Sequence, residues 1–331
     1  MKDFLKVENL CFGYLKQPLC LKDVNFSAGK KDRICVFGLD DKGKTSLIKT
    51  VSGFDLHFFG KVFIEGKEIK AIPDNERNVS LIFDEPIILN STIENNIDYL
   101  YETLKREVPS KQEKEELLKK FNLEFDLKTK VKKLSIFQKF KLCFLRSFAK
   151  GSKVIFLDDI LKHKFNDEEI EELKQIFDFW LNDKLVLFCA NEKSFAENKS
   201  FFEWFNPTKV LYVNNAKVYE NNSIDEFLKS FVDLDMCLFS NELEFVYGFC
   251  VYQDGEYYLS FNNESEIIVK IDKKLNENFE SLKLSNCDNE DIVLVYKKGL
   301  KIDLTKNNDI NKMFFGGDLM VFSKLDRTRV L

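Results

Sequence analysis

The sequence lacks long apolar runs. No stretch approaches the ~18–20 uncharged apolar residues that a membrane-spanning helix requires. Residues Met1–Val7 hold Asp3 and two lysines without an apolar run, so they do not resemble a signal peptide. We therefore expect a cytoplasmic protein, and any membrane association must come through a partner.

A basic excess and clustered metal ligands are also missing. There are 50 Lys and Arg residues against 55 Asp and Glu, a net charge of −5. Nucleic-acid binding, which needs a basic excess or a basic face, is therefore not expected. The eight cysteines include no Cys-x-x-Cys pair and the chain has only two histidines, so no zinc site is predicted. We expect reduced, mostly buried thiols.

The chain is long enough for two domains, with 331 residues of which 44% are hydrophobic. Residues 1–100 contain runs typical of strands, at Phe4–Leu10, Lys22–Phe26, Arg33–Phe37 and Lys61–Glu65. Residues 101–150 show helical spacing, at Glu113–Phe121 and Phe137–Ala149. Strand and helix patterns alternate again over Lys153–Leu157, Asp167–Leu181 and Lys184–Cys189. This alternation predicts an α/β fold with a parallel sheet covered on both faces.

The periodicity changes near residue 232. Phe245–Gln253 and Glu256–Phe261 alternate around Asp254-Gly255, which is a two-residue hairpin signal. Further short strands are expected at Ile267–Ile271, Ile292–Tyr296, Leu300–Leu304 and Leu319–Phe322. We predict a separate all-β domain over residues 232–331, either a small barrel or a sandwich.

A phosphate-binding loop is the main chemical signal. The run Gly38-Leu39-Asp40-Asp41-Lys42-Gly43-Lys44-Thr45 fits G-x-x-x-x-G-K-[ST] between an expected strand and an expected helix at Thr45–Val51. In such a loop, backbone amides and the helix N-terminus face a phosphate. Lys44 would neutralise the β/γ charge and the hydroxyl of Thr45 would bind Mg²⁺.

A carboxylate follows the apolar strand predicted at Lys153–Leu157. Lys153–Leu157 ends at Asp158, where a carboxylate can reach the Mg²⁺ of a bound nucleotide. An apolar run ending in Asp is by itself only a strand end. Its place after a good phosphate-binding loop makes Asp158 a predicted metal ligand.

Ordered landmarks over residues 1–230 resemble those of the ABC ATPases. They are Phe12-Gly13-Tyr14, Val51–Phe54, Gly60–Val62, Glu65–Lys67, Leu81–Pro86, Ser91–Ile97 and Leu134–Gln138. The resemblance implies that Tyr14 stacks on adenine and that Leu81–Pro86 contains the Q-loop. It also implies that Ser135 and Gln138, in a sequence similar to the L-S-G-G-Q signature, contact nucleotide. Ser46, next to Thr45, joins the implied cofactor-binding set.

The segment after residue 212 resembles the sugar importers of the maltose type. The similar stretches are Val213–Val218 and Ile224–Phe227. Those importers carry an appended OB-like regulatory β domain, which agrees with the reading of residues 232–331. The implied division is an ATP-binding domain over 1–230, with a helical subdomain at about 90–150, and a β-rich regulatory domain over 232–331.

Several positions depart from the ABC pattern. The catalytic Glu is replaced by Asp159, and a loss of positioning from a side chain shorter by one methylene costs about 10²-fold in rate. The switch His is replaced by Asn191. Neither His57 nor His163 is on that strand, and both are expected to be ordinary surface residues.

Three more regions depart from the pattern. The Q-loop Gln is replaced by Asp84, which we assign to catalysis and metal contact, and the signature glycines are replaced by Ile136 and Phe137. A Cβ at these two positions obstructs the approach of backbone to a γ-phosphate. Asp41 adds negative charge in the phosphate-binding loop, and Leu161–Phe165 lacks the usual Ser and Asp of the D-loop. We interpret the set as weakened hydrolysis with retained nucleotide binding.

The resulting prediction is a P-loop NTPase of the ABC type that binds ATP and Mg²⁺. Its catalytic set is Asp159, Asp84 and Asn191, and its metal set is Thr45, Asp158 and Asp84. The expected partners are transmembrane permease subunits of a carbohydrate-type importer, docked near the Q-loop, and a second ATP-binding chain. Two alternatives stay open: a non-hydrolysing, nucleotide-gated scaffold of a transporter, and a P-loop protein unconnected with membranes, such as a small-molecule kinase.

Overall fold

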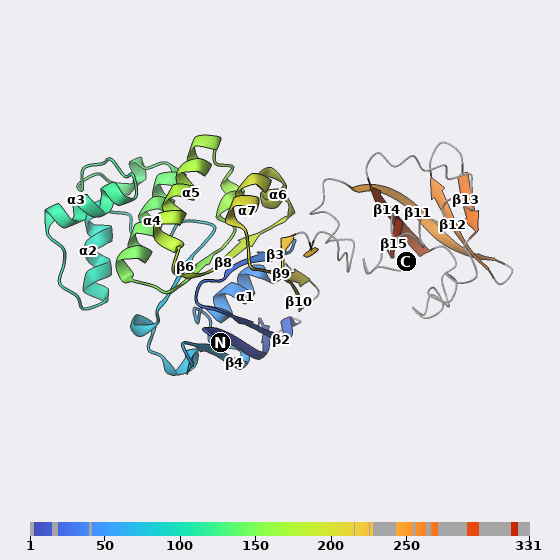
Figure 1. Ribbon diagram of the computed structural model, residues 1–331, viewed down its shortest axis with the longest axis horizontal. Coiled ribbons are helices and arrows are strands. Elements are labelled where there is room, and N and C mark those ends of the chain that lie inside the picture. The colour runs from blue at the N-terminus through green and yellow to red at the C-terminus, as the bar shows by residue number, and fades with distance from the viewer. Residues whose placement is uncertain are drawn as a thin grey trace. The chain divides into compact units, whose positions relative to one another are not determined.

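The computed structural model describes residues 3–14, 19–39, 42–214, 216–224 and 226–227, and the segments 243–253, 256–262, 266–270, 290–297 and 319–323. The chain divides into two compact units, Met1–Ile224 and Asp225–Leu331 (Figure 1). No helix in these described ranges is long and apolar enough to cross a membrane.

A six-stranded sheet forms the centre of the first unit. Its order is β10 (Lys217–Asn221), β9 (Lys209–Asn214), β3 (Arg33–Phe37), β8 (Leu185–Ala190), β7 (Val154–Leu157) and β6 (Val79–Ile82). The strands from β9 to β6 pair in parallel, and β10 is antiparallel to β9. The predicted parallel sheet is confirmed. Strands β7 and β8 are buried at every position, which is why they appear as continuous apolar runs.

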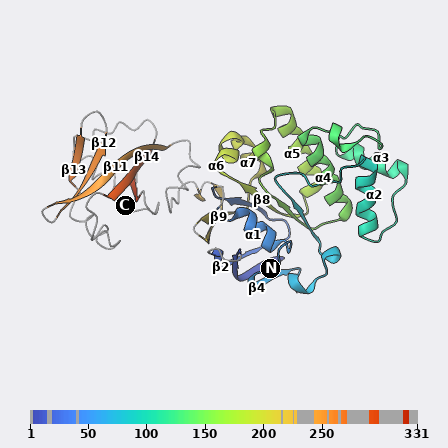
Figure 2. The same cartoon turned by 180° about the vertical axis from the view of Figure 1, so that it is seen from behind.

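The two faces of this sheet pack against different layers because successive side chains in a strand point to opposite faces. On one face, Val36, Phe156 and Leu187 share a core with α1 (Lys44–Val51). On the other face, Phe37 and Phe188 pack against phenylalanines of α6 (Glu192–Glu197) and α7 (Lys199–Phe205). Helix α5 (Asp167–Leu181), at its predicted bounds, lies on this second side (Figure 2).

The first hundred residues also form a second, antiparallel sheet. Its order is β2 (Leu19–Ala28), β1 (Leu5–Gly13), β4 (Phe59–Ile64) and β5 (Lys67–Glu68). The sequence pattern predicts strands at these places but not their separation from the parallel sheet. The connections between β1 and β2 and between β4 and β5 are too short for the crossover that parallel pairing requires, and β1 also pairs antiparallel with β4. Helix α1 shares a core with both sheets.

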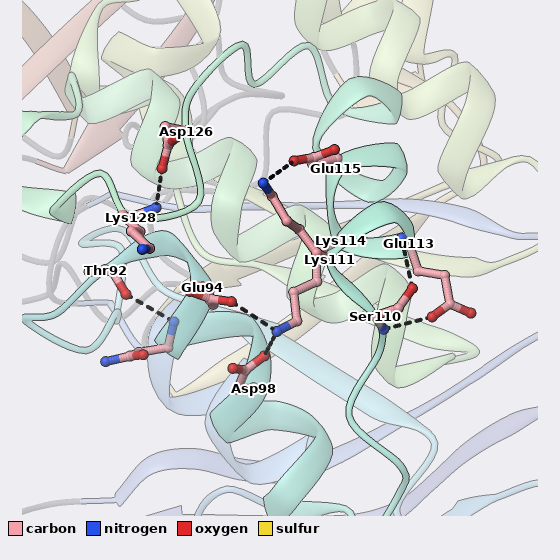
Figure 3. A network of polar contacts seen from close by, with 11 residues as sticks. Thr92, Glu94, Asp98, Ser110, Lys111, Glu113, Lys114, Glu115, Asp126 and Lys128 are labelled. Atoms are coloured by element: carbon pink, nitrogen blue, oxygen red, sulfur yellow. Dashed lines mark hydrogen bonds and ion pairs between the residues drawn. The ribbon is translucent and has the colours of Figure 1, made fainter.

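The helical insertion is made of α2 (Ile93–Thr103), α3 (Lys111–Lys120) and α4 (Ile136–Lys150), so both predicted helices of this region are confirmed. Among the described residues of the first unit, short 3-10 helices lie at Ile69–Ala71, Asp74–Glu76, Val131–Lys133 and Ile160–His163. Lys114 of α3 is buried between Glu94 and Asp98 of α2, with its Nζ 3.3 Å and 2.6 Å from their carboxylate oxygens (Figure 3). These ion pairs join the two helices.

In the second unit, the described strands form one antiparallel sheet. Its order is β13 (Glu266–Lys270), β12 (Glu256–Asn262), β11 (Leu243–Gln253), β14 (Glu290–Lys297) and β15 (Leu319–Ser323). Gln253 pairs with Glu256, which confirms the predicted hairpin. The strand predicted at Leu300–Leu304 lies outside the described residues. Whether the unit is OB-like stays a prediction.

Candidate functional site

The phosphate-binding loop connects β3 to α1, and its backbone requires glycine at both glycine positions of the motif, Gly38 and Gly43. A Cβ on Gly38 would lie 2.6 Å from the carbonyl oxygen of Val213. Gly43 has a φ of 103°, and a Cβ there would lie 3.0 Å from the carbonyl oxygen of Cys20. Larger residues would push the loop away from β2 and β9. Asp41 lies outside the described residues, so its predicted effect on the loop stays a prediction.

Lys44 is the first residue of α1 and is buried, with 6% of its surface exposed. Its Nζ donates hydrogen bonds to the loop carbonyls of Gly38, at 2.8 Å, and Leu39, at 2.7 Å. Gly43, the N-cap residue, supplies no side-chain cap to the helix. The ammonium and the amides of the first helical turn therefore meet at one place, which suits an anion such as a phosphate.

Thr45 and Asp158 meet beside Lys44, although they come from different elements. Thr45 Oγ1 donates a hydrogen bond of 3.1 Å to Asp158 Oδ1 at the carboxyl end of β7. Burial raises the pKa of Asp158 from 3.8 to about 6, and the negative charges of Asp84 and Asp159 add to this, while the Thr45 hydrogen bond and Lys44 oppose it. The carboxylate is thus held where burial outweighs the partial compensation that Thr45 and Lys44 provide for its charge.

A Mg²⁺ ion fits this pair of residues. Asp158 Oδ2 is buried and has no hydrogen-bond partner among the described residues. A carboxylate with an unused oxygen, next to a hydroxyl, is the kind of oxygen donor set that Mg²⁺ prefers. When bound with a nucleotide, the ion would neutralise phosphate charge. The predicted metal residues Thr45 and Asp158 are therefore together in the fold.

Asp159 and Asn191 are brought together by a residue that the sequence patterns did not single out. Asp159 has 7% of its surface exposed and a left-handed backbone, with φ 45°. Its Oδ1 accepts a 2.6 Å hydrogen bond from Ser194 Oγ. Asn191 caps α6 by accepting a 2.8 Å hydrogen bond from the amide of Ser194. The Asn-x-x-Ser spacing is a capping signal that predicts the second contact but not the first.

Asp84 follows β6 and is held by the segment that follows β7. Its carboxylate forms an ion pair with Lys162, and its carbonyl oxygen contacts Nε2 of His163. The charge of Asp84 contributes to the raised pKa of Asp158, so the two carboxylates are close enough to interact. A metal contact by Asp84 stays a proposal, since its carboxylate is paired with Lys162.

The two histidines differ from each other. The side chain of His57 is 97% exposed, so the prediction of a surface residue is confirmed there. The prediction is wrong for His163, whose side chain is 16% exposed. Its ring lies 5.4 Å from that of Phe140 and stacks on Phe165. Packing against Phe140 and contact with the Asp84 carbonyl keep this imidazole partly buried, and both of these partners are distant from it in sequence.

Tyr14 lies against the start of α1. Its hydroxyl is 3.3 Å from Ser46 Oγ, and its ring meets the ring of Phe12 edge to face, with centroids 5.1 Å apart. The residue remains 45% exposed, whereas Ser46 is buried. An exposed aromatic ring beside a phosphate-binding loop is available for stacking on a base, which is the role predicted for Tyr14.

The residues similar to the ABC signature form the N-terminus of α4. Ser135 and Gln138 make a capping box, in which Ser135 Oγ accepts from the Gln138 amide at 3.2 Å and Gln138 Oε1 accepts from the Ser135 amide at 2.9 Å. Phe137 is 2% exposed, and its ring packs against Phe165 with centroids 5.0 Å apart. A bulky residue at a signature glycine position thus has a packing role here.

Comparisons with known proteins agree with this geometry. The family model "ABC transporter" matches residues 21–162. The spermidine/putrescine import ATP-binding protein PotA of Thermotoga maritima is 26% identical over 245 residues, covering 72% of this chain and 64% of that protein. PotA of Clostridioides difficile is 29% identical over 163 residues, covering 47% of this chain and 46% of that protein. The matched part therefore spans less than two thirds of either relative.

A solved structure shares the fold. It is the dimeric post-hydrolysis state of the ATP-binding cassette MJ0796 bound to ADP and Pi, with a TM-score of 0.56 and 18% sequence identity. The likeness covers 66% of this chain and 98% of that one. The fold, the phosphate-binding loop and the family match agree with one another. Residues 21–162 are similar in sequence to the ABC transporter family, and the chain shares the fold of an ATP-binding cassette.

Proposed function

We propose that the chain is the ATP-binding subunit of an ABC importer and couples the binding of MgATP to solute transport. The observation that carries this proposal is the convergence of Lys44, Thr45 and Asp158 at the N-terminus of α1. Lys44 and the helix amides would hold the phosphates, and Thr45 and Asp158 the ion. Tyr14 would stack on the adenine, with Gly38, Gly43 and Ser46 completing the cradle.

Hydrolysis in this proposal is slow or depends on a partner chain. Asp159, Asn191 and Asp84 occupy the positions from which the water and the γ-phosphate would be contacted. Ser135 and Gln138 would face the nucleotide of a second ATP-binding chain. A second candidate function is a non-hydrolysing, nucleotide-gated scaffold. This function is favoured by Phe137, a buried residue at a position where ABC ATPases have a glycine. A side chain there obstructs the approach of the backbone to the γ-phosphate that hydrolysis requires.

A pocket of about 470 Å³ beside the Q-loop supports docking of a permease subunit. Phe54 and Ile87, which line it, are 66% and 63% exposed. Arg77, Arg146 and Lys150 also line it, against the single carboxylate of Asp74. Arg146 Nε is buried without a hydrogen bond within the described residues. We propose that an apolar cytoplasmic segment with an acidic side chain, from a transmembrane partner, occupies this pocket.

The class of solute follows from the relatives only as a proposal. The C-terminal resemblance favours carbohydrate, whereas both relatives named above import spermidine or putrescine. We therefore propose an importer without assigning the solute to sugars or polyamines. The solute would contact other subunits, so identifying those subunits in the native complex would decide between the two classes. The chain would work on the cytoplasmic face of the membrane as one of two ATP-binding chains.

Isolation of the native complex tests this function. The full chain is tagged and purified from detergent-solubilised membranes, and the chains that accompany it are identified. We expect transmembrane permease subunits. Arg146→Glu should release them while the MgATP-induced rise in melting temperature persists. Lys119→Glu, the same charge change on the exposed face of α3, should release nothing. A complex without membrane subunits would contradict the proposal.

A further inference from the structure

Ser194 occupies an unusual place between two residues assigned to the candidate site. It is 2% exposed, and its hydroxyl donates a 2.6 Å hydrogen bond to Asp159 Oδ1. That length is typical of a hydroxyl bound to a charged carboxylate, one of the stronger hydrogen bonds in proteins. The two residues are 35 positions apart, one after β7 and one in α6. The bond is therefore a tertiary contact between the ends of neighbouring strands.

The backbone of Ser194 is itself held at both polar groups. Its amide donates to Asn191 Oδ1 at 2.8 Å, and its carbonyl accepts from Asn198 Nδ2 at 3.0 Å. Asn191 and Asn198 are both buried, with 7% and 9% of their surfaces exposed. A hydroxyl carried on a backbone fixed in this way has little freedom to follow a moving partner. It can therefore dictate where the Asp159 carboxylate lies.

The carboxylate of Asp159 depends on a fixed hydrogen-bond partner more than the carboxylate of a longer glutamate would. Its backbone is left-handed, which costs energy for a residue with a Cβ unless the surroundings hold it. Its carboxylate also ends one methylene short of a glutamate, so a small rotation would carry it away from a bound nucleotide. Misplacement of a reacting group by about 1 Å can cost 10²-fold in rate.

We propose that Ser194 is a positioning residue for Asp159, holding its carboxylate toward the water that would attack the γ-phosphate. This inference rests on the proposed function, because it requires MgATP at the Lys44–Asp158 site. It assigns to α6 a role beyond packing: Asn191 caps the helix, and Ser194 within it supplies the hydroxyl that orients Asp159. The effect of Ser194 on rate should therefore pass through Asp159 alone.

The test is a double-mutant cycle on the full-length chain. Single-turnover hydrolysis of MgATP, with protein in excess, is measured for the wild type, Ser194→Ala, Asp159→Asn and the double variant. Ser194→Ala should slow hydrolysis by about 10- to 100-fold. In the Asp159→Asn background it should have no further effect, because the carboxylate that it orients is gone. The MgADP-induced rise in melting temperature should stay as in the wild type.

Two more variants separate positioning from stability. Ser194→Thr keeps the hydroxyl and should recover most of the rate that Ser194→Ala loses. Glu197→Gln breaks an ion pair between the same two segments, Lys164–Glu197 at 3.0 Å, and should leave the rate unchanged. Ser194→Ala hydrolysis within twofold of the wild type would overturn the proposal. So would equal losses in both backgrounds, which a merely structural role predicts.

A wild-type rate no greater than that of Lys44→Ala would also overturn it, because Asp159 would then have no reaction to support. The proposed function fails separately. If MgATP and MgADP leave the melting temperature of the wild type unchanged, nucleotide binding itself is absent. The melting and rate measurements thus report on the two proposals independently.

Discussion

Thr45 and Asp158 are 113 residues apart, yet the hydroxyl of one donates to the carboxylate of the other at 3.1 Å. The contact joins the first turn of α1 to the end of β7, and it leaves Asp158 Oδ2 buried without a partner in the described chain. Burial of an uncompensated carboxylate is unfavourable in itself. A cation bound at this carboxylate would offset the loss of folding stability. The loss can be measured as a change in the free energy of unfolding.

The first prediction concerns the stability cost of Asp158. Its pKa of about 6 in the folded protein exceeds the ordinary 3.8, so between these pH values the folded state binds more protons than the unfolded state. The free energy of unfolding should therefore fall as pH rises from about 4 to 6. Asp158→Asn should raise it by about 2–3 kcal/mol at pH 7.5 without Mg²⁺, and by much less at pH 4. Denaturant unfolding at both pH values measures this; a destabilised variant at pH 7.5 would contradict the assigned burial.

The second prediction concerns nucleotide binding. MgATP should raise the melting temperature of the wild type, and Lys44→Ala should abolish most of that rise because it removes the cation nearest the phosphates. Tyr14→Ala should weaken binding less, by about 1–3 kcal/mol, the range for stacking on one base. Lys49→Ala, on the same helix, serves as the control. Equal losses in Lys44→Ala and Lys49→Ala would mean that charge in general, and not the loop, binds the nucleotide.

The third prediction separates a buried lysine from an exposed one on α3. Lys114→Met should lower the free energy of unfolding by about 2–4 kcal/mol, because it leaves the paired carboxylates of Glu94 and Asp98 without their cation. Lys111→Met removes only the exposed 3.7 Å pair with Glu115 and should cost about 0–0.5 kcal/mol (Figure 3). Burial lowers the pKa of Lys114, but the ion pairs with Asp98 and Glu94 outweigh it and raise the pKa above 10.5. Their contribution is therefore complete at neutral pH and is lost only as pH rises through that higher value. Similar unfolding curves for the two variants would refute the structural role of Lys114.

The fourth prediction concerns the division of the chain. We expect limited proteolysis to cut between residues 215 and 245, a range that includes the boundary between Ile224 and Asp225. The N-terminal fragment should still show an MgATP-dependent rise in melting temperature, since every residue of the proposed nucleotide site precedes the cut. A fragment that loses this response would place part of the nucleotide site in the C-terminal unit.

Much of the first unit could be predicted from residues that are neighbours in sequence. The loop from Gly38 to Thr45 is contiguous, and its glycines are required by local backbone geometry and close approach. Strands β7 and β8 were recognisable because both faces are buried, so no polar residue interrupts them. Helix α5 begins at a capping box, Asn166 with Glu169, and was predicted at its observed bounds.

Other features were decided only by the tertiary structure. The sequence by itself determined the phosphate-binding loop, the strand–helix alternation and the identity of Asp158, because these depend on local dihedral angles and on periodicity. It did not determine that Ser194 meets Asp159, that Lys162 pairs with Asp84, or that His163 contacts the Asp84 carbonyl. Each of these contacts joins segments 35 or more residues apart. They form only because the parallel sheet places the ends of β6, β7 and β8 side by side, and strand order is a property of the whole fold.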